Sequence, residues 1–225
     1  MSNLGFRIFP DFERPDRELI ELFRDLPVAN IDDNMGRIAC VDSAIKPFNK
    51  AKLLGCAFTV KAPQGDNLMF HKALDMAKPG DILVVAGFGY VERSLCGEIM
   101  MRYAMLHKLG GFVIDGAIRD AEGARDLDFP VYARGVNPNG PYKNGPGEIN
   151  VPVACGGQVI FPGDILVGDE DGIVVIRPQD ARELAEKVRK TNDSETKTFE
   201  NMAKGIGMDR AWVEKALQDK GCEFC

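Results

Sequence analysis

The stretch that decides the fold is GGFVIDGAIRD, residues 110–120. The apolar run at 112–114 follows a glycine pair, which predicts a buried strand. The Asp-Gly pair at 115–116 is a turn signal, so we expect the strand to end there. Arg119 and Asp120 then lie side by side at the carboxyl end of the strand, where ligands of α/β sheets usually collect.

These two side chains suit a bound acid. A guanidinium can hold a carboxylate in a fork, and a neighbouring carboxylate can hold a divalent metal ion. The alternative is a surface ion pair that caps the next helix. The dipeptide alone leaves both interpretations open, so the rest of the chain has to distinguish them.

The composition is that of an ordinary globular protein, with 225 residues, 45% of them hydrophobic and 28% charged. This length allows one large domain, or a small domain with appendages. The net charge of -6 is spread without long blocks, which argues against nucleic acid as a partner. Residues 1–13 lack the regions of a signal peptide, and no apolar run approaches the length of a membrane span. We therefore expect a cytoplasmic protein that binds no membrane.

Six cysteines and two histidines limit the metal sites that one chain can build. In a cytosolic setting the cysteines stay reduced. Cys222 and Cys225 form a C-x-x-C pair at the end of the sequence, but neither His71 nor His107 is near them, so a zinc site is not indicated. We expect an oxidisable tail there, to which the sequence assigns no role.

Helical and strand patterns alternate in the middle of the chain, and strands dominate later, which predicts a layered α/β domain with a mixed sheet. Residues 137–150 are rich in glycine, proline and asparagine and are expected to form an extended functional loop. Asp66 and Ser94 are the expected caps of the helices that follow them. Helices are predicted at 16–26, 31–35, 67–77, 95–108, 121–126, 178–190, 194–212 and 213–220. Strands are predicted at 54–61, 82–86, 112–114 and 131–133, and within 151–176.

A second group of candidate residues is Gly97, Glu98, Ile99 and Met100, near the predicted start of a helix. Free backbone N–H groups and the helix dipole suit such a place to an anion, for example a substrate carboxylate. Gly97 would let the ligand approach the backbone, and Glu98 adds a carboxylate. A solvated glutamate in the first helical turn is the alternative interpretation of Glu98.

In this order, these features resemble one family: the divalent-metal aldolases that cleave 4-hydroxy-4-methyl-2-oxoglutarate and 4-carboxy-4-hydroxy-2-oxoadipate. The proteins named as regulators of ribonuclease E activity are close structural relatives of these enzymes. The resemblance spans residues 32–205. Besides Gly97-Glu98 and residues 113–120, it includes GDNL at 65–68, PGD at 79–81 and 162–164, FPVYARG at 129–135 and GDEDG at 168–172.

The resemblance implies an α/β fold, a swivelling β/β/α domain with a mixed sheet and helical extensions at both ends. It divides the chain into an N-terminal extension with a helix (1–30), an RraA-like β/β/α domain (31–178) and a C-terminal helical extension (179–225) that contacts a neighbouring subunit. It also implies homotrimers or homohexamers with sites between subunits.

The family's site residues can be carried over to this sequence. By resemblance, Asp120 is the direct ligand of Mg²⁺ or Mn²⁺, and Arg119 binds the pyruvoyl end of the substrate. Residues 97–100 present backbone N–H groups to the substrate carboxylate. Glu98 stands where relatives often have an acidic residue that orders water at the metal. Glu195 is the chosen carboxylate from the C-terminal helix of a neighbouring subunit.

One position departs from the family pattern. Relatives often have an acidic residue three positions after the aspartate, whereas here Gly123 stands there and Glu122 is one residue earlier. The role of Glu122 therefore stays open.

The implied reaction is a carbon–carbon cleavage that releases pyruvate and a second oxo acid. It passes through the enolate of pyruvate, which a Lewis-acidic metal and Arg119 stabilise. A water ordered by Glu98 or Glu195 is the candidate base. Oxaloacetate decarboxylation yields the same enolate and is the expected side activity.

Two alternatives remain. A Schiff-base lysine is the competing aldolase chemistry, with Lys61 and Lys143 as candidates. We prefer Lys143 as a loop contact to a distal carboxylate, although it is equally readable as an ordinary exposed lysine. The other function class is a non-catalytic regulator of a ribonuclease that acts by protein–protein contact. Asp120 and Glu98 favour the enzyme, and the sequence does not choose among the oxo acids.

Overall fold

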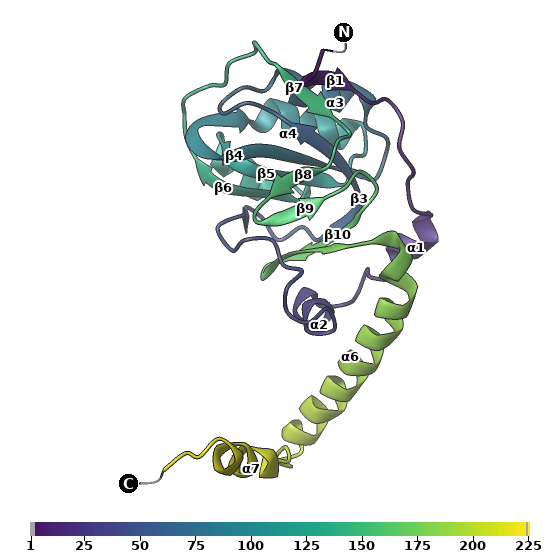
Figure 1. Cartoon of the computed structure of the whole chain (residues 1–225), viewed down its shortest axis with the longest axis vertical. Helices are drawn as coiled ribbons and strands as arrows, with labels where there is room; N and C mark the ends of the chain where they lie inside the picture. Colours follow the sequence, from purple (N-terminus) through teal and green to yellow (C-terminus); the bar gives the residue numbers. More distant parts are fainter. Residues whose placement is uncertain (1–2, 224) are drawn as a thin grey trace. The chain divides into compact units, whose positions relative to one another are not determined.

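A computed structural model describes residues 3–223 and 225. The chain divides into two compact units, Met1–Val188 and Arg189–Cys225. The first unit combines a sheet with helices, and the second is helical (Figure 1).

The strands are β1 (Phe6–Ile8), β2 (Lys46–Pro47), β3 (Leu53–Lys61), β4 (Asp81–Cys96), β5 (Gly111–Ile118), β6 (Val131–Val136), β7 (Gly147–Ile149), β8 (Val153–Cys155), β9 (Gln158–Ile160), β10 (Ile165–Asp169) and β11 (Gly172–Ile176). The helices are α1 (Arg17–Glu21), α2 (Val28–Asp33), α3 (Leu68–Met76), α4 (Glu98–Leu106), α5 (Ala121–Asp126), the 3₁₀ helix η1 (Pro178–Asp180), α6 (Ala181–Ala203) and α7 (Ala211–Asp219).

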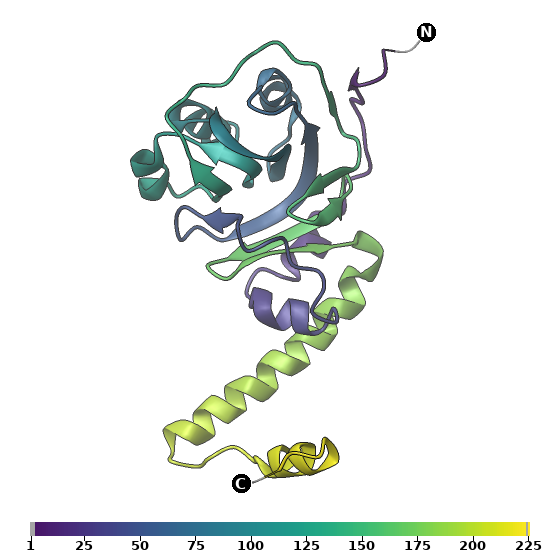
Figure 2. The same ribbon diagram turned by 60° about the vertical axis from the view of Figure 1, so that its left-hand side comes forward.

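The main sheet is mixed, as the sequence predicts. Its order is β1-β7-β3-β4-β5-β6-β2, and β10 and β11 extend it from β3. Strands β3 to β6 are parallel to one another, whereas β7 and β10 run antiparallel to β3. Strands β8 and β9 form a separate hairpin. Figure 2 shows helices α3 and α4 over one side of the sheet. Strands β8 to β11, drawn in green, pack on the other side.

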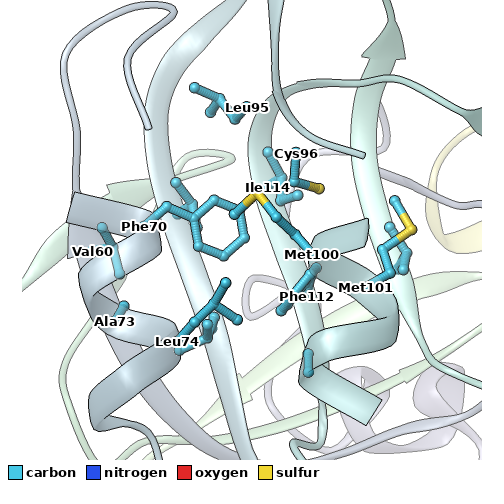
Figure 3. Packing of buried hydrophobic residues seen from close by; sticks show 14 of the residues in the cluster. Val60, Phe70, Ala73, Leu74, Leu95, Cys96, Met100, Met101, Phe112 and Ile114 are labelled. Carbon is cyan, nitrogen blue, oxygen red and sulfur yellow. The ribbon is translucent and has the colours of Figure 1, made fainter. Parts of the chain in front are cut away.

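Strand β5 is buried along its whole length because both faces of the sheet are covered. Phe112 and Ile114 point toward the helices, where Phe112 packs edge-on against Phe70 of α3 at 5.0 Å between ring centroids. Figure 3 shows this cluster, which also receives Met100 and Met101 from α4. Val113, between them in sequence, belongs to a second cluster with the β8–β9 hairpin. This three-layer packing is the β/β/α arrangement.

The glycine pair at the start of β5, Gly110 and Gly111, has a steric cause. A Cβ on Gly110 would lie 2.7 Å from the carbonyl oxygen of Gly80. Gly111 has φ +146, a backbone conformation that other residues rarely adopt, and a Cβ there would lie 2.9 Å from the oxygen of Pro130. Both glycines therefore let the strand enter the sheet between two loops.

The two Pro-Gly-Asp turns are built alike. The carboxylates of Asp81 and Asp164 are both buried, and each accepts the N–H of the residue three positions earlier, at 2.8 and 2.7 Å. Each also pairs with an arginine, Arg14 and Arg177 respectively. The shared sequence thus reflects a shared way of placing a buried carboxylate before a strand.

Strand β5 does not end at Asp115-Gly116, so that prediction was wrong. The strand continues to Ile118, and the irregularity falls on β4, whose pairing shifts between Val85 and Tyr90. Gly116 permits the shifted pairing because it has no Cβ. A Cβ at this position would lie only 3.2 Å from the Tyr90 oxygen. Asp115 is held inside by Arg134 and by the N–H of Gly156.

Strand β4 is also much longer than the predicted 82–86. Ser94 therefore lies within a strand, where its N–H and hydroxyl both donate to the Asn139 oxygen, and it caps no helix. Helix α4 begins at Glu98 with Gly97 at the N-cap. At α3 the N-cap is Asn67, although Asp66 accepts the Leu68 N–H at 2.9 Å.

Other boundaries also differ from prediction. Helix α1 is shorter than the predicted 16–26, and helix α2 begins and ends earlier than the predicted 31–35. The predicted loop 137–150 ends in β7, which pairs with β1 and β3. Helix α6 runs unbroken through the gap predicted after 190, because no helix-breaking residue occurs there. None of the helices among the described residues combines the length and apolar character needed to cross a bilayer.

The Arg189–Cys225 unit, described by itself, holds most of α6 and all of α7. It exposes several large apolar side chains: Phe199, Met202, Ile206, Met208 and Trp212. Cys222 and Cys225 are exposed free thiols.

Candidate active site

The ends of β4 and β5 bring the two predicted groups of residues together. The N–H of Arg119, just after β5, donates to the oxygen of Cys96, the last residue of β4, at 2.9 Å. Gly97 therefore lies beside Arg119 and Asp120, as the parallel sheet requires.

Asp120 is held from the neighbouring helix. Its Oδ2 accepts the N–H of Glu98 at 3.0 Å, so the carboxylate lies at the N-terminus of α4. Asp120 has φ 57 and occupies the N-cap of α5, but its side chain makes no capping hydrogen bond to that helix. The left-handed backbone thus turns the carboxylate away from its own helix. Its Oδ1 has no hydrogen-bond partner within the described part of the chain.

The ion pair between Arg119 and Asp120 is loose. The Nε of Arg119 lies 3.8 Å from Oδ2 of Asp120, and the side chains are 45% and 46% exposed. Exposed pairs of this kind contribute little to stability. Both charges therefore remain accessible to a ligand, which weakens the interpretation as a surface ion pair that caps a helix.

Gly97 is required by close packing. A Cβ on Gly97 would collide with the Asp120 carboxylate and lie 3.0 Å from Cγ and Nε of Arg119. Of the backbone donors predicted for a substrate, two are already used: Glu98 N–H donates to Asp120, and Met100 N–H to the Gly97 oxygen at 3.1 Å. The expected cradle of residues 97–100 is thus partly satisfied within the chain.

Glu98 fills the space that Gly123 leaves open. A Cβ on Gly123 would collide with the carboxylate of Glu98, so the glutamate from α4 lies over α5. Its Oε1 accepts two bonds from Arg102, both at 2.6 Å. The Glu98 carboxylate therefore lies beside Gly123, whereas Glu122 is exposed.

Gly97, Arg119 and Asp120 open onto a small pocket of about 170 Å³, whereas the predicted residue Glu98 is not among those that line it. That volume equals about six water molecules at about 30 Å³ each, which suits a small organic acid. The pocket is lined by Asn67, His71, Cys96, Gly97, Ile99, Met100, Arg119, Asp120, Pro141 and Lys143.

Sequence reasoning did not select four of the lining residues: Asn67, His71, Cys96 and Pro141. Asn67 and His71 are four residues apart at the start of α3, a helical spacing that could have indicated a shared face. Lys143 lines the pocket and Lys61 does not, so the geometry favours Lys143 of the two lysines considered.

Three of the lining residues, Asn67, Cys96 and His71, differ in the polar groups that they offer a ligand. Asn67 donates to the Leu95 oxygen at 2.9 Å, while its Oδ1 has no partner among the described residues. Complete burial raises the pKa of the Cys96 thiol, which favours its protonated form. Burial, and then the charge of Lys143, lower the pKa of His71, which is neutral at pH 7.

The Asp120 carboxylate is the feature of this site that suits a hard divalent metal ion. Mg²⁺ typically takes one or two carboxylates and keeps water or substrate oxygens as its other ligands. Asp120 offers a half-exposed carboxylate with one uncommitted oxygen. Among the described residues, no group of three or more histidine, cysteine or acidic side chains converges. Further protein ligands would have to come from elsewhere, and Glu195, in the Arg189–Cys225 unit, stays a prediction.

A larger hollow of about 730 Å³ lies between residues 13–19 and the segments 161–164 and 177–179. It contains no predicted site residue. Both arginines that line it are already paired, Arg177 with Asp164 and Arg14 with Asp81, and Arg177 also stacks on Phe161 at 4.3 Å. The smaller pocket contains Arg119, Asp120 and the predicted residues around Gly97, and it is the better candidate.

Comparison with known proteins agrees with these features. The model of the RraA-like family, described as Aldolase/RraA, matches residues 28–175. A protein of Halalkalibacterium halodurans, provisionally named 4-hydroxy-4-methyl-2-oxoglutarate aldolase, is 35% identical over 89% of this chain and 96% of its own length.

Two solved structures share the fold. An uncharacterised protein from Pseudomonas syringae superposes with a TM-score of 0.77 at 25% identity, over 86% of this chain and 96% of its own. RraAS2 of Streptomyces coelicolor, described as an unusual member of the RNase ES inhibitor RraA family, superposes with a TM-score of 0.73 at 28% identity. That match covers 83% of this chain and 98% of the other.

Proposed function

This chain belongs to the RraA-like family, and we propose that within it the protein is a divalent-metal-dependent aldolase. The proposed reaction cleaves 4-hydroxy-2-oxo acids with two or three carboxylates into pyruvate and a second oxo acid. Oxaloacetate decarboxylation is the expected side activity. The observation that carries the proposal is the half-exposed Asp120 carboxylate, anchored through one oxygen by the Glu98 N–H beside Arg119.

Arg119 and the end of β5 position the reacting end of the substrate. The guanidinium can bind the carboxylate and keto oxygens of the oxo acid, and it opposes the negative charge that develops there when the carbon–carbon bond breaks. A Mg²⁺ or Mn²⁺ ion held by Asp120 would supply Lewis acidity to the same oxygens.

Glu98 is our candidate for moving the proton of the C4 hydroxyl. Its carboxylate lies over α5 and is oriented by Arg102, and it can act through an intervening water. We also propose that Glu195 of a neighbouring subunit completes the acidic set. This assigns the 179–225 extension to subunit contact, in a homotrimer or homohexamer.

The test of the aldolase is pyruvate release from 4-hydroxy-4-methyl-2-oxoglutarate, 4-carboxy-4-hydroxy-2-oxoadipate and oxaloacetate. Release should require Mg²⁺ or Mn²⁺ and stop with EDTA. Asp120→Asn should lower kcat/KM by about 100-fold or more, because the several kcal/mol supplied through the metal is lost. Asp128→Asn, at an exposed position outside the pocket, is the matched control. Metal-independent release, or equal activity of both variants, would contradict the proposal.

A non-catalytic regulator of a ribonuclease is the second candidate, because the Streptomyces coelicolor relative is described as belonging to a ribonuclease inhibitor family. The same purified protein can be added to a ribonuclease E digestion. Inhibition that persists in Asp120→Asn, together with no pyruvate release by the natural chain, would favour this function.

A further inference from the structure

Helix α3 presents a polar edge to the pocket. His71 lies one turn after Asn67, and its N–H donates to the Asn67 oxygen at 3.0 Å, so both residues lie on one face of the helix. Both line the pocket, while Phe70 and Leu74 pack into the core. The His71 imidazole is half-buried and has no hydrogen-bond partner among the described residues, so its ring N–H is available to a ligand.

The opposite wall of the pocket is a loop that is held in place before any ligand binds. The buried Asp66 carboxylate accepts the N–H groups of Asn144 at 2.6 Å and Gly145 at 3.0 Å. Tyr142 is tied on both sides, donating to the Gly65 oxygen and accepting from Asn67, at 2.8 and 2.9 Å. Lys143, between these anchors, is therefore brought to the pocket by its backbone.

The charges of the pocket are uneven. Of the residues that the structure describes, Asp120 is the only acidic one that lines it, whereas Arg119 and Lys143 contribute positive charges. Lys143 makes no ion pair with any described residue. The neutral imidazole and the unpaired ammonium can both donate hydrogen bonds to a ligand, and Asp120, the carboxylate in the lining, lies beside Arg119 instead.

We propose that His71 is a specificity-determining residue of the site, which together with Lys143 binds the second carboxylate of a dicarboxylic oxo acid. Arg119 and Asp120 hold the oxo-acid end, and His71 holds the end that departs with the second product. This inference rests on the proposed function and deepens it, because it names His71 as a residue that recognises the acidic group beyond the carbon–carbon bond that breaks.

The test uses two ligands of the same chain length that the proposed reaction cannot cleave: 2-oxoglutarate, with a distal carboxylate, and 2-oxopentanoate, without one. Calorimetric titration of the full chain in Mg²⁺ buffer measures both affinities. The natural protein should bind 2-oxoglutarate at least about tenfold more tightly, and His71→Ala should lose about tenfold for that ligand alone. His71→Gln, which keeps an N–H donor, should recover part of the loss.

His107→Ala is the matched control, because this second histidine stacks on Tyr103 at the end of α4 and does not line the pocket. Thermal unfolding checks that every variant is folded. An unchanged ligand preference in His71→Ala, equal binding of both ligands by the natural chain, or binding of neither would overturn the inference. Preferential binding of 2-oxoglutarate without pyruvate release would instead refute the aldolase and leave the role of His71 standing.

Discussion

Gly97 and Gly123 determine the local geometry of the site through the side chains that they lack. Gly97 allows Asp120 and Arg119 to approach the start of α4, and Gly123 makes room for Glu98. The sequence indicated Gly97 as a point of close backbone approach, although the close groups are protein side chains. The Gly123–Glu98 contact joins residues 25 positions apart, so only the packed helices reveal it.

Gly123→Ala should separate activity from stability. The added methyl group would displace the Glu98 carboxylate, so pyruvate release should fall about 10-fold to 100-fold if Glu98 takes part in proton transfer. Alanine also favours the helix by about 0.5–1 kcal/mol, so the free energy of unfolding should not fall. Kinetics and urea denaturation measure the two effects. Gly207→Ala, which adds a methyl group in open space, is the control. Full activity in Gly123→Ala would exclude Glu98 from catalysis.

At the scale of elements, the boundaries around the site depend on bulges rather than on turn signals. Asp115-Gly116 resembles a strand end, but β5 passes through it while β4 changes its pairing. Sequence patterns indicate the local conformational preference of a segment. Here the register shift occurs in the neighbouring strand, β4. The loop at 137–150 was predicted, whereas its attachment to Asp66 and to the far end of β4 was not, because those hydrogen bonds join distant segments.

Asp66 is the residue on which this loop depends most. Asp66→Asn would turn an amide toward backbone N–H groups that need an acceptor, which should cost about 1–3 kcal/mol in the free energy of unfolding. The affinity for 2-oxoglutarate should fall as well, because Lys143 loses its support. Urea denaturation and calorimetry measure the two effects, with Asp171→Asn in the exposed β10–β11 turn as control. Equal stability of both variants would show that Asp66 does not anchor the loop.

At the scale of the whole molecule, the proposed subunit contact can be followed through Trp212, the one tryptophan of the sequence. It is 63% exposed in the single chain. If the 179–225 extension packs on a neighbouring subunit, dilution should dissociate the oligomer and shift the Trp212 emission to longer wavelength. Phe199→Ser should weaken the assembly in light-scattering measurements, because an exposed apolar side chain of the same unit is lost.

Lys187→Ser, on the exposed surface of α6, is the control for that substitution. A monomer at all concentrations, or an oligomer that Phe199→Ser leaves unchanged, would contradict the assignment of this extension to subunit contact.

The sequence by itself determined the α/β class and the mixed sheet, because both follow from its alternating patterns. That Gly97 belongs to one site with Arg119 and Asp120 followed from the family resemblance of the sequence, and the adjacent ends of β4 and β5 account for it. Only the tertiary structure decided the lengths of β4 and β5, the placement of Glu98 over Gly123 and the entry of Asn67 and His71 into the pocket. The physical reason is that these features depend on contacts between segments far apart in the chain, which local propensity does not encode.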